Sequence, residues 1–167
     1  MSTALVAQPL SREAFAPFGD VIETERAEHY TINAGWAERF HDLAALDVAA
    51  TPGRPGLSIF RAKPRPQPAA LTLIERHLQS SQAFMPLGRE RFLIVVAAPG
   101  PAPTQAEQLR VFISDGAQGV NYRAGTWHHP LIAIGQEADF LIVDRIGAPR
   151  DCEDIDITPW GVTIAAV

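Results

Sequence analysis

The stretch Arg91-Phe92-Leu93-Ile94-Val95-Val96-Ala97-Ala98 is the clearest strand signal in the chain and decides the fold class. It is short and rich in Val, Ile, Leu and Phe, which is strand composition. Its apolar character is unbroken, and this suits a central strand with both faces buried better than an edge strand. We therefore expect a buried strand here, and we read the rest of the chain outward from it.

Nine further short runs have the same composition, and glycine and proline residues separate them throughout. They are Asp20–Glu23, Leu57–Arg61, Leu71–His77, Arg110–Ser114, Val120–Tyr122, Leu131–Ile134, Phe140–Asp144, Ile155–Ile157 and Val162–Val167. About ten short strands at this spacing favour an all-β sandwich or barrel over alternating βαβ units. The four most apolar segments should be buried strands of one barrel: Leu93–Val96, Val111–Ile113, Leu131–Ile134 and Phe140–Val143.

Two short helices are also predicted. Ser11 is placed to cap a helix over Arg12–Ala16, before a turn containing proline and glycine. The run Thr104–Glu107 fits a capping box ahead of Leu109. The proline-rich stretch Lys63–Pro68 resembles an extended linker, but we interpret it as a loop or stiff edge segment.

Length and composition favour one domain over residues 1–167, since 47% of the residues are hydrophobic and 20% are charged. A net charge of −5 makes nucleic acid an unfavourable partner. The apolar runs are far shorter than the roughly 18 residues of a membrane helix. Met1–Leu5 has no signal-peptide pattern, and Cys152 is the only cysteine, so no internal disulfide forms. We expect a cytoplasmic protein.

Two segments concentrate the polar chemistry. The first begins as an apolar strand at Leu73 and then turns polar through Glu75-Arg76-His77 and Ser81-Gln82. Polar groups gathered at a strand end are costly to bury without partners, so they indicate a site. Strand alternation places Glu75 and His77 on one face and Arg76 on the other.

The second segment is Tyr122-Arg123-Ala124-Gly125-Thr126-Trp127-His128-His129-Pro130-Leu131. A double histidine flanked by tryptophan and proline, ahead of an apolar strand, is more specific than a lone histidine. In extended backbone, His128 and His129 point to opposite faces. One of them can then face a barrel interior while the other faces a subunit contact or solvent.

Together these motifs resemble those of the bacterial ureidoglycolate lyase family. The resemblance is carried by Glu75-Arg76-His77 with Ser81–Leu87, by Gly119–Tyr122 with Gly125–Leu131, and by Asp139–Arg145. It implies a cupin-like double-stranded β-helix, a jelly-roll barrel, assembled as a homodimer. The implied reaction is the cleavage of (S)-ureidoglycolate into glyoxylate and urea during allantoin breakdown, part of purine catabolism.

The comparison with cupins also bears on whether this protein binds a metal ion. Metal-binding cupins use a His-x-His, a glutamate and a later histidine, and by resemblance His128 matches the later histidine and Glu90 the glutamate. The His-x-His has no counterpart, because that region reads Ser81–Phe84. One imidazole and one carboxylate make a weak ligand set for a transition metal, which usually takes several imidazole or thiolate ligands, so no cofactor is expected. If a metal such as nickel is present, the candidate ligands are His128, Glu90 and Gln82.

The implied reaction needs a general acid and a general base tuned near neutral pH. We assign His128 as the leading acid or base and His77 as the second, with Glu75 orienting one of them or substituting for it. Arg76 is the candidate clamp for the substrate carboxylate.

Ser81 and Gln82 are the candidates for the ureido group, and His129 is a further candidate for substrate binding. Because Arg76 falls on the opposite face from Glu75 and His77, one of these assignments is wrong unless a bulge or a dimer interface intervenes. Two alternatives stay open: a non-catalytic cupin that binds a small acid, and a hydrolase that releases ammonia from the same substrate.

Overall fold

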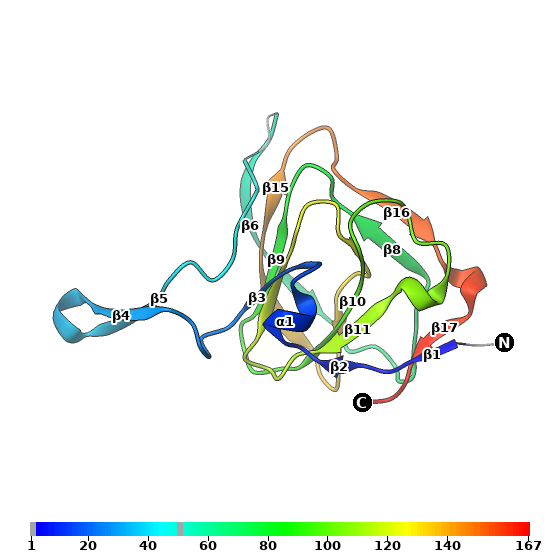
Figure 1. Ribbon diagram of the computed structural model, residues 1–167, viewed down its shortest axis with the longest axis horizontal. Helices are drawn as coiled ribbons and strands as arrows, with labels where there is room; N and C mark the ends of the chain where they lie inside the picture. Colours follow the sequence, from blue (N-terminus) through cyan, green and yellow to red (C-terminus); the bar gives the residue numbers. More distant parts are fainter. Residues whose placement is uncertain (1–2, 50–51) are drawn as a thin grey trace.

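Two facing sheets of β-strands form a barrel in the computed structural model, which describes residues 3–49 and 52–167 (Figure 1). One sheet has five strands in the order β3-β12-β9-β15-β6, and the other has seven, with the path β16-β8-β13-β10-β11-β2 and β14 beside β10. The five strands are β3 (Gly19–Ile22), β6 (Arg54–Ala62), β9 (Gln82–Pro86), β12 (Gly119–Tyr122) and β15 (Ala138–Ile146). The seven are β2 (Gln8–Pro9), β8 (Leu73–Arg76), β10 (Phe92–Ala97), β11 (Arg110–Ile113), β13 (Trp127–His128), β14 (Ile132–Ala133) and β16 (Glu153–Asp156).

The strand order is that of a jelly roll. Strands β6, β9, β12 and β15 lie in one sheet, while β8, β10, β11 and β13 with β14 lie in the other. Within each sheet, antiparallel neighbours such as β8 and β13, or β9 and β15, are far apart in sequence. Such interleaved Greek keys define the double-stranded β-helix, so the predicted all-β, cupin-like fold is confirmed.

Strand β10 is the centre of the core, as predicted from its sequence. Phe92, Ile94 and Val96 face the barrel interior, while Leu93 and Val95 face a second cluster outside the seven-stranded sheet. That outer cluster is covered by a three-stranded sheet and by two 3₁₀ helices. The sheet consists of β1 (Thr3–Leu5), β17 (Val162–Ile164) and β7 (Ala69–Ala70); the helices are η2 (Ala106–Gln108) and η3 (Thr158–Trp160).

Of the two predicted helix N-caps, one is confirmed and one is wrong. Ser11 accepts a hydrogen bond from the Ala14 amide and caps α1 (Arg12–Phe15), as predicted. The capping box at Thr104 is wrong by one position: the cap is Gln105, and the side chain of Gln108 returns to it. The Gln108 side chain accepts hydrogen bonds from the amides of both Thr104 and Gln105, and the short helix begins at Ala106.

Strands β4 (His29–Ile32) and β5 (Ala37–Phe40), joined by the 3₁₀ turn η1 (Asn33–Gly35), form a hairpin that projects away from the barrel (Figure 1). We call residues 24–42 the arm. Sequence reasoning missed it, because its polar composition shows no core-facing pattern. Met1 and Ser2, part of the stretch on which no signal peptide was predicted, lie outside the described residues. No helix among the described residues is long and apolar enough to cross a membrane.

Candidate active site

Glu75 and His128 face each other across the antiparallel pair of β8 and β13, where they are direct register partners. His77 follows Glu75 by two positions and therefore shares its face. One donor atom from each of the three side chains lies within 4.8 Å of the others. The predicted alternation is confirmed, and it brings the three proposed acid–base residues together.

Backbone carbonyls orient both imidazoles of this cluster. His128 Nδ1 lies 3.0 Å from the Thr126 carbonyl, and His77 Nδ1 contacts the Asp151 carbonyl. A carbonyl only accepts, so each Nδ1 carries the hydrogen and each Nε2 is left for other partners. His128 Nε2 lies 3.6 Å from Glu75 Oε1, an ion-pair distance just longer than a hydrogen bond.

Burial and neighbouring groups set the ionisation states of Glu75 and Tyr122 in this cluster. Burial opposes ionisation of Glu75, but the neighbouring imidazoles of His128 and His77 outweigh it, and the pKa of Glu75 falls below its ordinary value. Tyr122 stacks on the His128 ring with centroids 4.3 Å apart. Burial, together with the nearby Glu75 charge, raises the pKa of Tyr122, so its phenol stays neutral. Glu75 is thus held as a carboxylate beside two imidazoles.

A pocket of about 530 Å³ opens above the cluster, lined by Glu75 and His77 and also by Gln82, Asp144 and Arg150. Gln82 Nε2 donates to Asp144 Oδ2 at 3.2 Å. The other oxygens of these two side chains, and Nε2 of His77, are buried without a hydrogen-bond partner among the described residues. Buried polar atoms are normally paired, so these atoms point to a ligand rich in hydrogen-bonding groups.

Arg150 supplies an exposed cation at the pocket, on the loop that follows β15. The loop is shaped by Arg145, whose buried guanidinium donates to the carbonyls of Gly147, Pro149 and Pro52. Sequence reasoning missed Arg150 and Asp144 as site residues. Asp144 is the polar residue that ends the apolar run Phe140–Val143, and such a position could have indicated a site residue. The sequence around Arg150 contains no comparable pattern.

The structure does not bring Arg76 to the pocket. Its guanidinium binds Glu153 and the Gly100 carbonyl, and lies 4.4 Å from the centre of the Trp127 ring on the opposite face of β8. The proposed role of Arg76 as carboxylate clamp is therefore corrected. Strand alternation places Arg76 on the face of β8 opposite Glu75 and His77, as the sequence had indicated.

Two other proposed binding residues, Ser81 and His129, are buried and bonded to the backbone. Ser81 is buried and exchanges hydrogen bonds with the backbone of Asp47, and the pocket is lined by Ser80 instead. His129 is buried, with Nδ1 bonded to the Pro130 carbonyl. Burial lowers the pKa of His129 to about 4, so it is neutral at physiological pH.

The same three donors form a set of ligands that suits a divalent metal ion. Metal-binding histidines commonly donate one ring N–H to a carbonyl and offer the other nitrogen to the ion, as His77 and His128 do here. This set shares only His128 with the ligands predicted from the sequence. Glu90 accepts a hydrogen bond from Gln136 and Gln82 donates to Asp144, and the cluster contains Glu75 and His77 in their place.

The family model described as ureidoglycolate lyase matches residues 2–164. The ureidoglycolate lyase of Burkholderia cepacia is 54% identical over 149 residues, covering 89% of this chain and 83% of that protein. That of Pseudomonas savastanoi pv. phaseolicola is 50% identical, covering 90% and 88%. Among solved structures, the dTDP-6-deoxy-D-glucose-3,5-epimerase RmlC of Legionella pneumophila is 15% identical, with a TM-score of 0.46 over 85% of this chain and 80% of that one. This last likeness is too distant to bear on the site.

Proposed function

This chain belongs to the ureidoglycolate lyase family, and we propose that it cleaves ureidoglycolate into glyoxylate and urea by general acid–base elimination at the cluster of Glu75, His77 and His128. The resemblance read from the sequence is confirmed. The observation that supports this chemistry best is the pair of oriented imidazoles beside an ionised carboxylate, of which Glu75 and His77 line a polar pocket and His128 lies buried behind them.

Ureidoglycolate is a carbinolamide, in which one carbon carries a hydroxyl, a carboxylate, a hydrogen and a urea nitrogen. Cleavage removes the hydroxyl proton while the carbon–nitrogen bond breaks, and the leaving urea nitrogen must receive a proton. Histidine suits both proton transfers. In the proposal His128 Nε2, paired with Glu75, gives the proton to urea, and His77 Nε2 takes the proton from the hydroxyl.

The remaining pocket residues fit the two ends of this substrate. The ureido group offers several N–H donors, and Gln82 Oε1 and Asp144 Oδ1 are buried acceptors without a partner among the described residues. The substrate carboxylate needs a cation, and Arg150 is the arginine proposed for it. We keep Gln82 in its predicted role and replace Arg76 by Arg150.

The test of this function is product analysis. Incubation with (S)-ureidoglycolate should release glyoxylate and urea in equal amounts, with no ammonia. Ammonia as the nitrogen product would identify a hydrolase. Binding without turnover would identify a small-acid-binding module, the other alternative.

Replacing Arg150 by Gln should raise KM by about 10- to 100-fold, because a charge-assisted hydrogen bond to the carboxylate is lost. Steady-state kinetics measure this directly. Arg76→Gln is the matched control, and it should leave KM nearly unchanged while lowering thermal stability, because Arg76 packs on Trp127 and binds Glu153. The reverse pattern would return the clamp to Arg76.

A divalent ion bound by the three donors would supply Lewis-acid polarisation of substrate oxygens. Our proposal instead uses both Nε2 atoms for proton transfer, so the metal-free protein should be active after chelation and dialysis. Added Ni²⁺ should bind with one ion per chain, measured by calorimetry, and should inhibit by occupying those atoms. Activation by Ni²⁺ would contradict the acid–base assignment.

The cellular location, the pathway and the assembly of the protein are also proposed. A cytoplasmic location is supported by the single cysteine, Cys152, which has no possible intrachain partner. A role in allantoin breakdown follows from the proposed substrate. The homodimer that the family resemblance implies is also part of this proposal.

A further inference from the structure

Asp151 borders the candidate active site, and the mechanism proposed above gives its side chain no role. It lies on the segment between β15 and β16, directly after Arg150 and before Cys152. All three residues line the polar pocket. The backbone carbonyl of Asp151 accepts the hydrogen of His77 Nδ1. The position of this segment therefore decides how the His77 ring is held.

The side chain of Asp151 fastens the segment to the end of β8. Its carboxylate accepts hydrogen bonds from the Leu78 amide, 2.9 Å from Oδ1, and from the Gln79 amide, 2.8 Å from Oδ2. The Ser80 hydroxyl donates to Oδ2 at 3.5 Å. With the ring of His77, four consecutive residues thus donate to Asp151. Because the carboxylate and the carbonyl belong to one residue, bonds to the first fix the position of the second.

Strand pairing does not extend to this contact. The ladder between β16 and β8 has its outermost pair at Glu153 and Arg76, and both Asp151 and His77 lie beyond it. The two backbone amides that follow His77 therefore need acceptors other than a neighbouring strand. A carboxylate has two oxygens, one for each amide, and bonds to an ionised acceptor are short and strong. The carboxylate of Asp151 thus replaces the missing strand pairs.

The bond at His77 Nδ1 also decides which ring nitrogen is bare. A neutral imidazole carries its hydrogen on one nitrogen and a lone pair on the other. The Asp151 carbonyl holds the hydrogen on Nδ1, so the lone pair lies on Nε2, which is buried without a hydrogen-bond partner among the described residues. In the proposed mechanism Nε2 takes a proton from the substrate hydroxyl, and it can do so only through that lone pair.

We propose that Asp151 is a positioning residue of the reaction. Its carboxylate holds its own carbonyl against His77 Nδ1, and so sets both the orientation and the tautomer of the base. This inference rests on the proposed function, in which His77 is the proton acceptor. The carbonyl contacts the ring, while the carboxylate acts at a distance, through the backbone of the same residue.

The first test compares two variants of Asp151 with the wild type in steady-state kinetics. Asp151→Ala frees the carbonyl and should lower kcat by about 10- to 100-fold, since a small displacement of a catalytic group has an effect of this size. Asp151→Asn keeps one acceptor oxygen for two amides, and its kcat should fall between those of Asp151→Ala and the wild type. In both variants kcat should change more than KM. A kcat of Asp151→Ala equal to that of the wild type would overturn the proposal.

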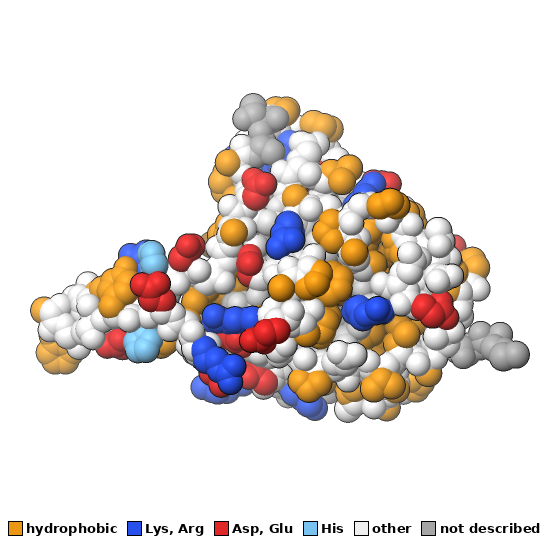
Figure 2. All heavy atoms as spheres, in the orientation of Figure 1, with side chains coloured by type: hydrophobic (Ala, Val, Ile, Leu, Met, Phe, Trp, Pro, Cys, Tyr) orange, Lys and Arg blue, Asp and Glu red, His pale blue; other side chains and the backbone are white. Residues whose placement is uncertain are grey.

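The second test observes the tautomer directly. In protein with isotope-labelled histidine, long-range proton–nitrogen correlation spectra distinguish a ring nitrogen that carries hydrogen from a bare one. At about pH 8, where an ordinary imidazole is neutral, wild-type His77 should carry hydrogen on Nδ1, and Asp151→Ala should shift this population toward Nε2. The exposed His29 and His41 serve as references, since they lie on the arm, where Figure 2 shows histidine side chains at the surface. An unchanged His77 signal would overturn the proposal.

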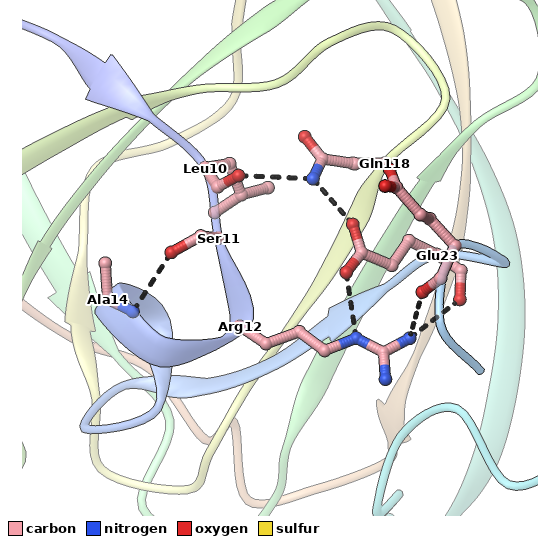
Figure 3. A network of polar contacts seen from close by, with 7 residues as sticks. Leu10, Ser11, Arg12, Ala14, Glu23 and Gln118 are labelled. Carbon is pink, nitrogen blue, oxygen red and sulfur yellow. Dashed lines mark hydrogen bonds and ion pairs between the residues drawn. The ribbon is translucent and has the colours of Figure 1, made fainter. Parts of the chain in front are cut away.

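Asp115→Ala is the matched control. Asp115 Oδ1 accepts from the amides of Ala117 and Gln118 at 2.7 and 3.1 Å, so here too a carboxylate bonds two backbone amides. This turn lies between β11 and β12, and its Gln118 side chain belongs to the polar network at the root of the arm (Figure 3). Asp115→Ala should lower the melting temperature about as Asp151→Ala does, and should leave kcat and the His77 tautomer unchanged. An equal loss of kcat in both variants would mean that lost stability explains the effect, and would overturn the proposal.

The third test combines Asp151→Ala with His77→Asn. If the carboxylate acts through His77, the double variant should have the kcat of His77→Asn alone, because residues that act as a unit are not additive. A loss equal to the product of the two separate losses would overturn the proposal.

Failure of this inference and failure of the proposed function give different results. A wild type that releases no urea from (S)-ureidoglycolate would contradict the proposed function, and this inference with it. Urea release by the wild type, together with an unaltered kcat and His77 tautomer in Asp151→Ala, would contradict this inference alone.

Discussion

His128→Asn is expected to lower kcat by about 10²- to 10⁴-fold, the range typical of a lost general acid or base. The effect should fall on kcat more than on KM, because the proton moves only in the transition state. The variant keeps a polar side chain at a position that is 1% exposed. Far-UV spectra and thermal melts should show that the barrel still forms, and stopped assays of glyoxylate give kcat.

The neighbouring residue provides the control. His129 is also buried, and its low pKa keeps it neutral at the pH of the assay. His129→Asn should therefore cost less than about tenfold in kcat, since no proton transfer is removed. Equal and mild losses for His128→Asn, His129→Asn and His77→Asn would mean that the imidazoles are structural.

Glu75→Gln should lower kcat by about 10²-fold or more, because it removes the negative charge that lies 3.6 Å from His128 Nε2, the proposed proton donor. The substitution keeps the shape and removes the charge. A second readout is folding stability against pH. A carboxylate with a depressed pKa stabilises the fold above its ordinary value of 4.5, and this contribution is lost as the pH falls through the folded value. The stability difference between the wild type and Glu75→Gln should therefore shrink below that pH.

Cys152→Ala serves as the control for Glu75. The Cys152 thiol lies 3.5 Å from Glu75 Oε2, so this change removes a neighbour of the carboxylate but not its charge. Burial and the charge of Glu75 raise the pKa of the thiol, which makes it a poor nucleophile. Kinetics close to wild type are expected, and a loss as large as that of Glu75→Gln would show that the thiol takes part in the reaction.

Local sequence patterns predicted the central strands and missed the elements defined by tertiary context. Strand β10 is apolar at every position, and both of its faces are buried. The predicted strand at Leu131–Ile134 shortens to Ile132–Ala133, but it is buried as expected. Strand β9 was missed because it contains glutamine and proline, and its burial comes from lying between β12 and β15. The arm was missed because it packs on no core of its own chain.

The site was predictable to the extent that it depends on alternation within one strand. The rule that placed Glu75 and His77 together also placed Arg76 on the far face, where it binds Glu153. The pairing of Glu75 with His128 depends on the register of two distant strands, which alternation cannot supply. Arg150 was beyond reach because its loop is shaped by the hydrogen bonds of Arg145 to backbone carbonyls.

The pairing of β8 with β13 has a consequence for folding. Glu75 meets His128 across more than fifty residues of chain, and Gln82 meets Asp144 across 62. Contacts of such long range cost loop-closure entropy before they add stability, and folds dominated by them fold slowly. The complete acid–base cluster therefore forms only when the barrel closes, and a fragment that lacks β13 lacks His128, while one that lacks β8 lacks Glu75. During refolding, enzyme activity should return with the slowest phase, after β-structure is already visible in the far-UV spectrum.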